Sequence, residues 1–185
     1  MAGVYNVYLK NLGPQNSTNW DAAAMTAVAT NLKQLFDDVC QNSKSAYSSS
    51  ACQWDPTSGT VKDTELLVYV LNDSSQSLIA KNHSKWKIDL TKGGNTFWVG
   101  NSTPRISEVY LDTMLKYVDA HILIAKLAFH ELMHNKLEAF DVHSKGGGGL
   151  ATGGPITSST PLNDTNKELM AKSLGKRVSQ FQGGL

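Results

Sequence analysis

The pentapeptide His130-Glu131-Leu132-Met133-His134 has the residue types and the spacing of a zinc-binding catalytic site. In a helix, residues four apart lie one turn above each other, so the two imidazoles can occupy two corners of a tetrahedral site. Glu131 can reach a water on the metal and act as a base. With five His and five Glu in 185 residues, random placement gives this pattern roughly 0.004 times per chain. The sequence therefore predicts a metal centre with His130 and His134 as ligands.

The residues before the pentapeptide predict a buried helix. The segment 118–129 is rich in helix formers and contains neither Gly nor Pro. Its apolar side chains recur on most faces, which is typical of a helix that runs through the middle of a domain. Polar side chains on such a helix need partners, and metal ligation supplies them. A hydrogen-bonded structural cluster is the alternative for the same side chains.

A catalytic zinc usually has three protein ligands and one open position, and three residues after the pentapeptide are candidates for the third. We expect His143, because nine residues allow one more helical turn and a return, and the glycines at 146–149 permit a close backbone path. An exposed loop imidazole is the other interpretation of His143. Asp141 is expected to accept a hydrogen bond from a ligand His, or to be a turn residue. Glu168, in a later helical segment, is the remaining candidate ligand.

The pentapeptide and its uncharged neighbours Leu127, Ala128 and Asn135 resemble the active-site helix of the zincins, the HExxH zinc metallopeptidases. Lys136 departs from the family pattern, which commonly has an apolar residue at this place. The resemblance covers only the motif and its surroundings. It implies that the two His bind Zn²⁺ and that Glu131 is the general base of peptide hydrolysis.

Two groups of zincins suggest where the third ligand comes from. Metzincins have a third His shortly after HExxH, as His143 would be here, but this chain has Leu137 and Phe140 where metzincins have Gly and that His. The resemblance to metzincins is therefore distant. Gluzincins take a Glu from a later helix, as Glu168 would be. Metzincins also place a Met below the zinc, but Met170 lies in a helical pattern and is expected in the core.

The resemblance implies a zinc metalloendopeptidase that acts on a protein or peptide substrate. A zinc amidase that cleaves a non-peptide or cell-wall amide would use the same residues, so this alternative stays open. A binding or effector module that keeps the zincin scaffold with little turnover is a third reading. Tyr110, Tyr117 and Lys145 are candidates to stabilise the oxyanion, and the sequence does not choose among them.

Composition argues against several classes of partner. The net charge is +1 with no dense basic run, which argues against nucleic acids and membrane surfaces, and no apolar stretch approaches about 18 residues. The first residues lack the plan of a secretory signal, so we expect a cytoplasmic protein or one released by a non-classical route, as a toxin or effector is. Cys40 and Cys52 can form a disulfide or stay free. We expect a monomer.

The remaining patterns predict an α+β fold in a single domain over residues 1–185, and the order of the elements resembles the zincin plan, which implies a zincin-like fold. Strands are expected at 4–9, 65–71, 96–99 and 105–110, and helices at 20–40 and from a cap at Asn163 or Asp164 through Val178. The expected sheet is small, twisted and mixed, and packs on the long N-terminal helix and on the motif helix.

Three further segments bear on the cleft. The segment 43–60 is expected to be a polar loop that could cover the cleft. The segment 146–162 either rims the cleft or is a plain connector. The strand at 96–99 is expected either as the edge strand that binds an extended peptide, as the resemblance implies, or as an ordinary core strand.

Overall fold

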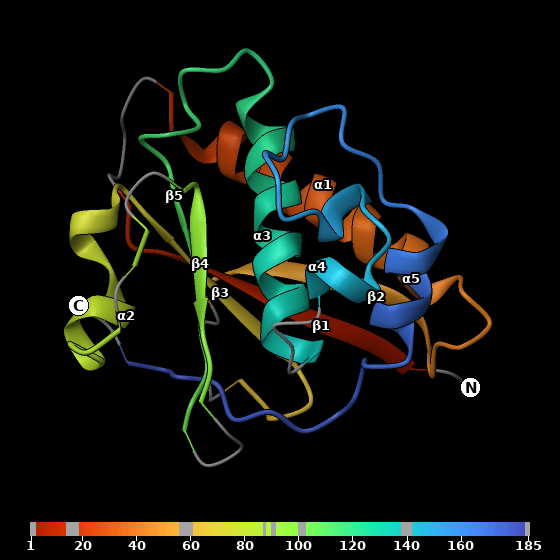
Figure 1. Cartoon of the computed structure of the whole chain (residues 1–185). Helices are drawn as coiled ribbons and strands as arrows, with labels where there is room; N and C mark the ends of the chain where they lie inside the picture. The colour runs from red at the N-terminus through yellow and green to blue at the C-terminus, as the bar shows by residue number, and fades with distance from the viewer. Residues whose placement is uncertain are drawn as a thin grey trace.

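The structure, a computed structural model, describes residues 3–13, 19–55, 61–86, 88–89, 92–99, 103–137 and 142–183. A five-stranded sheet lies between two layers of helices, with α1, α3, α4 and α5 on one side and α2 on the other (Figure 1). The elements are β1 (Gly3–Asn11), α1 (Ala22–Cys40), β2 (Tyr47–Trp54), β3 (Leu66–Leu71), α2 (Leu78–Asn82), β4 (Gly94–Phe97), β5 (Ile106–Tyr110), α3 (Ala120–Leu137), α4 (Val142–Lys145) and α5 (Asp164–Ala171).

The strand order in the sheet is β2-β1-β3-β5-β4. The first four of these strands run parallel to their neighbours, whereas β4 pairs with β5 in the antiparallel direction. The α+β class with a mixed sheet is therefore confirmed. In the part of the chain that the structure describes, no helix is both long and apolar enough to cross a membrane.

The apolar run predicted as a central strand is confirmed as β3. Leu66, Val68 and Val70 face one side and pack with α1 and α3, whereas Leu67 and Tyr69 face α2 on the other. A strand that is covered on both faces needs apolar side chains at every position, which explains the continuous run. This strand fixes the centre of the sheet.

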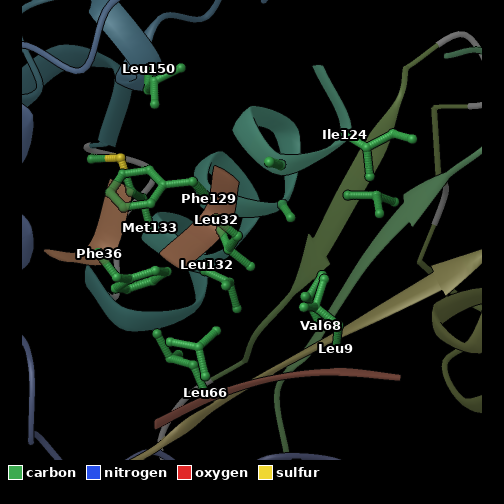
Figure 2. Close-up of a cluster of buried hydrophobic side chains, with 14 of the residues drawn as sticks. Leu9, Leu32, Phe36, Leu66, Val68, Ile124, Phe129, Leu132, Met133 and Leu150 are labelled. Carbon is green, nitrogen blue, oxygen red and sulfur yellow. The ribbon is translucent and has the colours of Figure 1, made fainter. Parts of the chain in front are cut away.

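The main core lies between the sheet and the pair α1 and α3 (Figure 2). Leu32 and Phe36 of α1 meet Phe129 and Leu132 of α3, and the rings of Phe36 and Phe129 have centroids 5.0 Å apart. All four side chains are fully buried. The motif helix is thus buried as predicted, because residues on several of its faces contact other elements.

The helix predicted at 20–40 is observed as α1, which begins at Ala22 after the N-cap Asp21. The carboxylate of Asp21 accepts a hydrogen bond from the backbone N of Ala24 at 2.8 Å and so satisfies a free donor of the first turn.

The prediction of a polar loop at 43–60 is wrong where the structure describes the segment as β2. This strand pairs with β1 at the edge of the sheet opposite β4, so it does not cover the cleft beside α3. The serines of β2 give no alternation of apolar and polar residues that would indicate a strand. The strand is stabilised instead by backbone pairing with β1 and by contacts with α1. Residues 56–60 lie outside the described part.

Asp37 joins α1 to β2 and gives a test of this packing. Its Oδ1 accepts hydrogen bonds from the backbone N and the hydroxyl of Ser50, both at 2.8 Å, and Lys33 donates to Oδ2. Burial raises the pKa of Asp37, but the hydrogen bonds from Lys33 and Ser50 outweigh it and hold the pKa below 3.8.

We expect Asp37→Ala to lower the free energy of unfolding by about 1–2 kcal/mol near neutral pH, because charge-assisted hydrogen bonds are lost. A carboxyl whose pKa is lower in the folded state stabilises above its unfolded pKa. The difference between wild type and variant should therefore shrink as the pH falls below 3.8, which urea unfolding at several pH values measures. Asp38→Ala, one position along α1, is the control and should change stability by less than about 0.5 kcal/mol. A pH-independent Asp37 difference would contradict this account.

The last helix is shorter than predicted. α5 begins after the predicted cap Asn163 but ends at Ala171 rather than at Val178, and a turn follows it up to Gly175, whose φ is 81°. The following segment, 176–183, runs back along the sheet, where the backbone N of Val178 donates to the carbonyl of Asp63 at 2.7 Å. Met170 is buried in the core, as expected.

Cys40 and Cys52 are free thiols in this structure. Burial raises the pKa of Cys40 to about 11 and raises that of Cys52 further. Both sulfur atoms are therefore in the neutral, poorly reactive form at neutral pH.

Candidate metal centre

Helix α3 places His130 and His134 on one face, as their spacing predicts. The Nε2 atoms of the two rings lie 3.1 Å apart. The Nε2 atom of His143, on the short helix α4, lies 3.0 Å from that of His134. Among the described residues, these three His form a cluster whose candidate ligand atoms all lie within 4.8 Å of one another.

Four successive glycines follow His143 and bring the chain back past α3. Gly147, Gly148 and Gly149 have φ values of 65°, 79° and 60°, a left-handed path that other residues rarely adopt. At Gly146 a side chain would clash, because an added Cβ would lie 2.0 Å from the Cβ of Ala151. The glycines therefore permit a close backbone path after His143, whereas residues 138–141, which lead to His143, lie outside the described residues.

This return places a carbonyl oxygen against the first imidazole. The Nδ1 atom of His130 lies 2.6 Å from the carbonyl oxygen of Leu150. Because a carbonyl only accepts hydrogen bonds, Nδ1 carries the hydrogen, and the Nε2 of a neutral His130 points its lone pair at the cluster. Burial lowers the pKa of His130 to about 4, so the ring is neutral near pH 7.

The side-chain amide of Asn166 in α5 holds the segment 146–150 in place. Its amide nitrogen donates to the carbonyls of Gly146 and Gly148 at 2.7 and 3.1 Å, and its amide oxygen accepts from the backbone N of Leu150 at 2.9 Å. The side chain is fully buried. Asn166 therefore sets the position of the Leu150 carbonyl and, through it, the orientation of His130.

The spacing of the three rings is compatible with a bound zinc ion. Two ligand nitrogens in a tetrahedral zinc site lie about 3.3 Å apart, close to the distances from His134 to the other two rings. A single hydrogen on the Nε2 of His134 could serve only one of its two close contacts. A cation between the three rings would account for both.

Glu131 is buried beside the cluster, with 5% of its surface exposed. Its Oε2 accepts a hydrogen bond from the Thr96 hydroxyl of β4 at 2.7 Å. Burial raises the pKa of Glu131 to about 8, although the Thr96 hydrogen bond and the charge of Lys92 act to lower it. A divalent cation nearby would favour the carboxylate further, because opposite charges stabilise each other in a buried site.

A cleft of about 430 Å³ opens over His130, Glu131 and His143. This volume lies in the range of small-molecule and peptide side-chain sites. Apolar side chains and two lysines form the walls. The apolar residues are Met114, Leu123, Leu127 and Ile156, and the lysines are Lys92 and Lys116. The segment 152–156 forms one wall, so the chain after α4 rims the cleft rather than acting as a plain connector.

The alternative third ligands do not join the cluster in the described residues. Glu168 lies on the surface of α5, where its carboxylate pairs with Lys172 at 2.6 Å. Asp141 lies outside the described residues, as does Phe140. The structure thus brings together His130, His134 and His143.

The three oxyanion candidates occupy different places. Tyr110 is fully buried, and its hydroxyl donates to Glu108 at 2.6 Å, so it does not reach the cleft. Tyr117 lines the cleft and is 54% exposed. Lys145 is exposed on α4 and does not line the described cleft. Lys92 and Lys116 do line it, and the sequence interpretation overlooked them.

Two other His lie apart from the cluster. His121 is half-buried near the start of α3. His83 is also half-buried, and its ring stacks on Phe97 with centroids 3.7 Å apart. It caps α2 at the opposite face of the sheet.

Lys136, the departure from the zincin pattern, is buried with only 1% exposed. Its ammonium donates to the carbonyl of Lys176, and the amides of Asn135 and Gln180 pair with each other at 2.9 and 3.1 Å. The polar residues after His134 therefore hold the segment 176–183 against α3.

No known protein family, curated protein or solved structure matches the chain.

Proposed function

We propose that this protein is a zinc-dependent hydrolase of the zincin type that cleaves peptide bonds. One observation carries the proposal: the ligand atoms of three imidazoles lie within 4.8 Å of one another, and two of these residues, His130 and His143, line one cleft together with Glu131. A structural zinc site closes its coordination shell with four protein ligands and has no use for an adjacent base. Three nitrogen ligands and a carboxylate are the set that metal-assisted hydrolysis needs.

The roles of the side chains follow from their positions. His130, His134 and His143 would hold the ion, which when bound acidifies water and polarises a carbonyl. Glu131 accepts a proton from the attacking water as the new C–O bond forms. It then gives this proton to the leaving nitrogen as the C–N bond breaks.

The position of β4 supports a peptide as the substrate. This strand is the edge of the sheet next to the motif helix, and Gly93 and Gly94 line the cleft. An edge strand can bind an extended chain by main-chain hydrogen bonds and so present a peptide bond to Glu131. The apolar walls near Leu123 and Leu127 suit a large apolar side chain of that peptide.

The zinc-loaded protein should cleave members of a mixed peptide library, with new termini detected by mass spectrometry. A chelator should abolish this cleavage, and added zinc should restore it. Cell-wall fragments are incubated in parallel. If only the cell-wall fragments were cleaved, the protein would be an amidase rather than a peptidase. If protein with one bound zinc cleaved neither the peptides nor the fragments, it would be a binding module.

A further inference from the structure

Strand β4 contacts Glu131 with two residues on the same face. Residues two apart in a strand point to the same side, and Gly94 and Thr96 both face α3. The Thr96 hydroxyl lies 2.7 Å from Oε2 and 2.8 Å from the backbone carbonyl oxygen of Glu131. The inner face of β4 therefore meets both the side chain and the backbone of this residue.

Gly94 leaves the space that the Glu131 side chain occupies. A Cβ at this position would lie 2.9 Å from both Cγ and Oε1 of Glu131 and 2.8 Å from the carbonyl oxygen of Glu108. Contacts this short force a shift, and the Glu108 carbonyl is part of the paired strand β5. The carboxylate would therefore have to move.

The distances favour the carboxylate as the acceptor of the Thr96 hydrogen. The Ser107 hydroxyl accepts from the amide of Asn135 at 2.9 Å, so its own hydrogen is available for the Glu131 carbonyl at 3.3 Å. The single Thr96 hydrogen has three acceptors within reach, and Oε2 at 2.7 Å is nearer than the Glu131 carbonyl at 2.8 Å or the Ser107 hydroxyl at 3.2 Å. Asn135 is in turn held by the amide of Gln180, so the chain of hydrogen bonds extends from the carboxylate to the segment 176–183.

We propose that Gly94 and Thr96 form a seat that holds one oxygen of the Glu131 carboxylate and directs the other into the cleft. The Thr96 hydroxyl anchors Oε2, and the space at Gly94 admits Oε1 and Cγ. Both are positioning residues for the base, so the inference rests on the proposed function. A hydroxyl both donates and accepts, which keeps this contact compatible with a base that takes up and releases a proton.

The kinetic test compares Thr96→Val, which keeps the shape without the hydroxyl, with Thr96→Ser, which keeps the hydroxyl. On a peptide that wild type cleaves, we expect Thr96→Val to lower kcat by about 10- to 100-fold with KM within about 2-fold, because a misplaced catalytic group costs about that much. Thr96→Ser should stay within about 3-fold of wild type. Gly94→Ala should lower kcat as much as Thr96→Val.

Zinc content and thermal unfolding are measured for every variant, so that unfolding is recognised. Thr26→Val, which removes an exposed hydroxyl of α1 that donates to the Ala22 carbonyl, is the matched control and should leave kcat unchanged. If the Thr96→Val variant is folded, binds zinc and keeps the wild-type kcat, the proposed seat for Glu131 is wrong. Equal losses in the Val and Ser variants would overturn it as well.

A second measurement does not depend on hydrolysis. Crystal structures of the metal-free wild type, Thr96→Val and Thr96→Ser should show the Glu131 carboxylate displaced in the Val variant alone. If it is displaced but wild type hydrolyses nothing, the seat stands and the proposed function fails. If wild type hydrolyses peptides while the carboxylate keeps its place in Thr96→Val, the seat fails and the function stands.

Discussion

Glu131→Gln should reduce peptide hydrolysis by at least about 10³-fold while the fold and the zinc content stay as in wild type. General base catalysis typically contributes about 10²- to 10⁴-fold, and a neutral amide of the same shape cannot accept the proton of the attacking water. Glu131 has no direct part in the three-nitrogen cluster, so metal uptake should not change. The measurement is kcat/KM on a cleaved peptide, together with zinc content by elemental analysis.

Stability gives this variant an independent readout. Burial raises the pKa of Glu131 to about 8, which means that burying this carboxyl group costs free energy of folding in the metal-free protein. The melting temperature of metal-free Glu131→Gln should therefore equal or exceed that of wild type. Glu168→Gln, on the surface of α5, is the matched control and should keep full activity. Near-wild-type turnover in Glu131→Gln would remove Glu131 from the role of base.

His143→Ala should weaken zinc binding by more than about 100-fold. Loss of a partner that only orients a ligand already costs about 10- to 100-fold, and His143 offers a ligand atom itself. The ring lies on the surface side of the cluster, so its loss should leave the metal-free fold intact. Competition with a chromophoric chelator measures the affinity.

His121→Ala is the control for this variant, because His121 lies on the same helix but outside the cluster. Its zinc affinity should equal that of wild type. If His143→Ala bound zinc normally while Glu168→Ala lost the metal, the third ligand would be Glu168, as in the gluzincin arrangement. In that case the pairing of Glu168 with Lys172 would have to break when zinc binds.

The common helix face of His130 and His134 could be predicted from the sequence because helical spacing is a local property. Residues 130 and 134 share a face in any α-helix, and the apolar residues around them require burial of that helix. The same holds for β3, whose uninterrupted apolar run can satisfy both faces of a central strand. In both places the pattern and the element coincide.

Strand β2 was missed because its stability is not local. Its burial alternates poorly, and two serines precede the buried Ser50, so composition favours a loop. The backbone of β1 supplies the hydrogen bonds, and the carboxylate of Asp37 supplies a partner for Ser50. Neither partner can be recognised from the residues of β2 themselves.

By itself the sequence determined which chemistry this protein can hold: two imidazoles and a carboxylate on one helix, and glycines that permit a return. The tertiary structure alone decided which groups complete the site. His143 reaches the cluster, the Leu150 carbonyl orients His130, and Thr96 holds Glu131. These contacts join segments 9 to 35 residues apart, and their distances depend on how the sheet and helices pack rather than on any local periodicity.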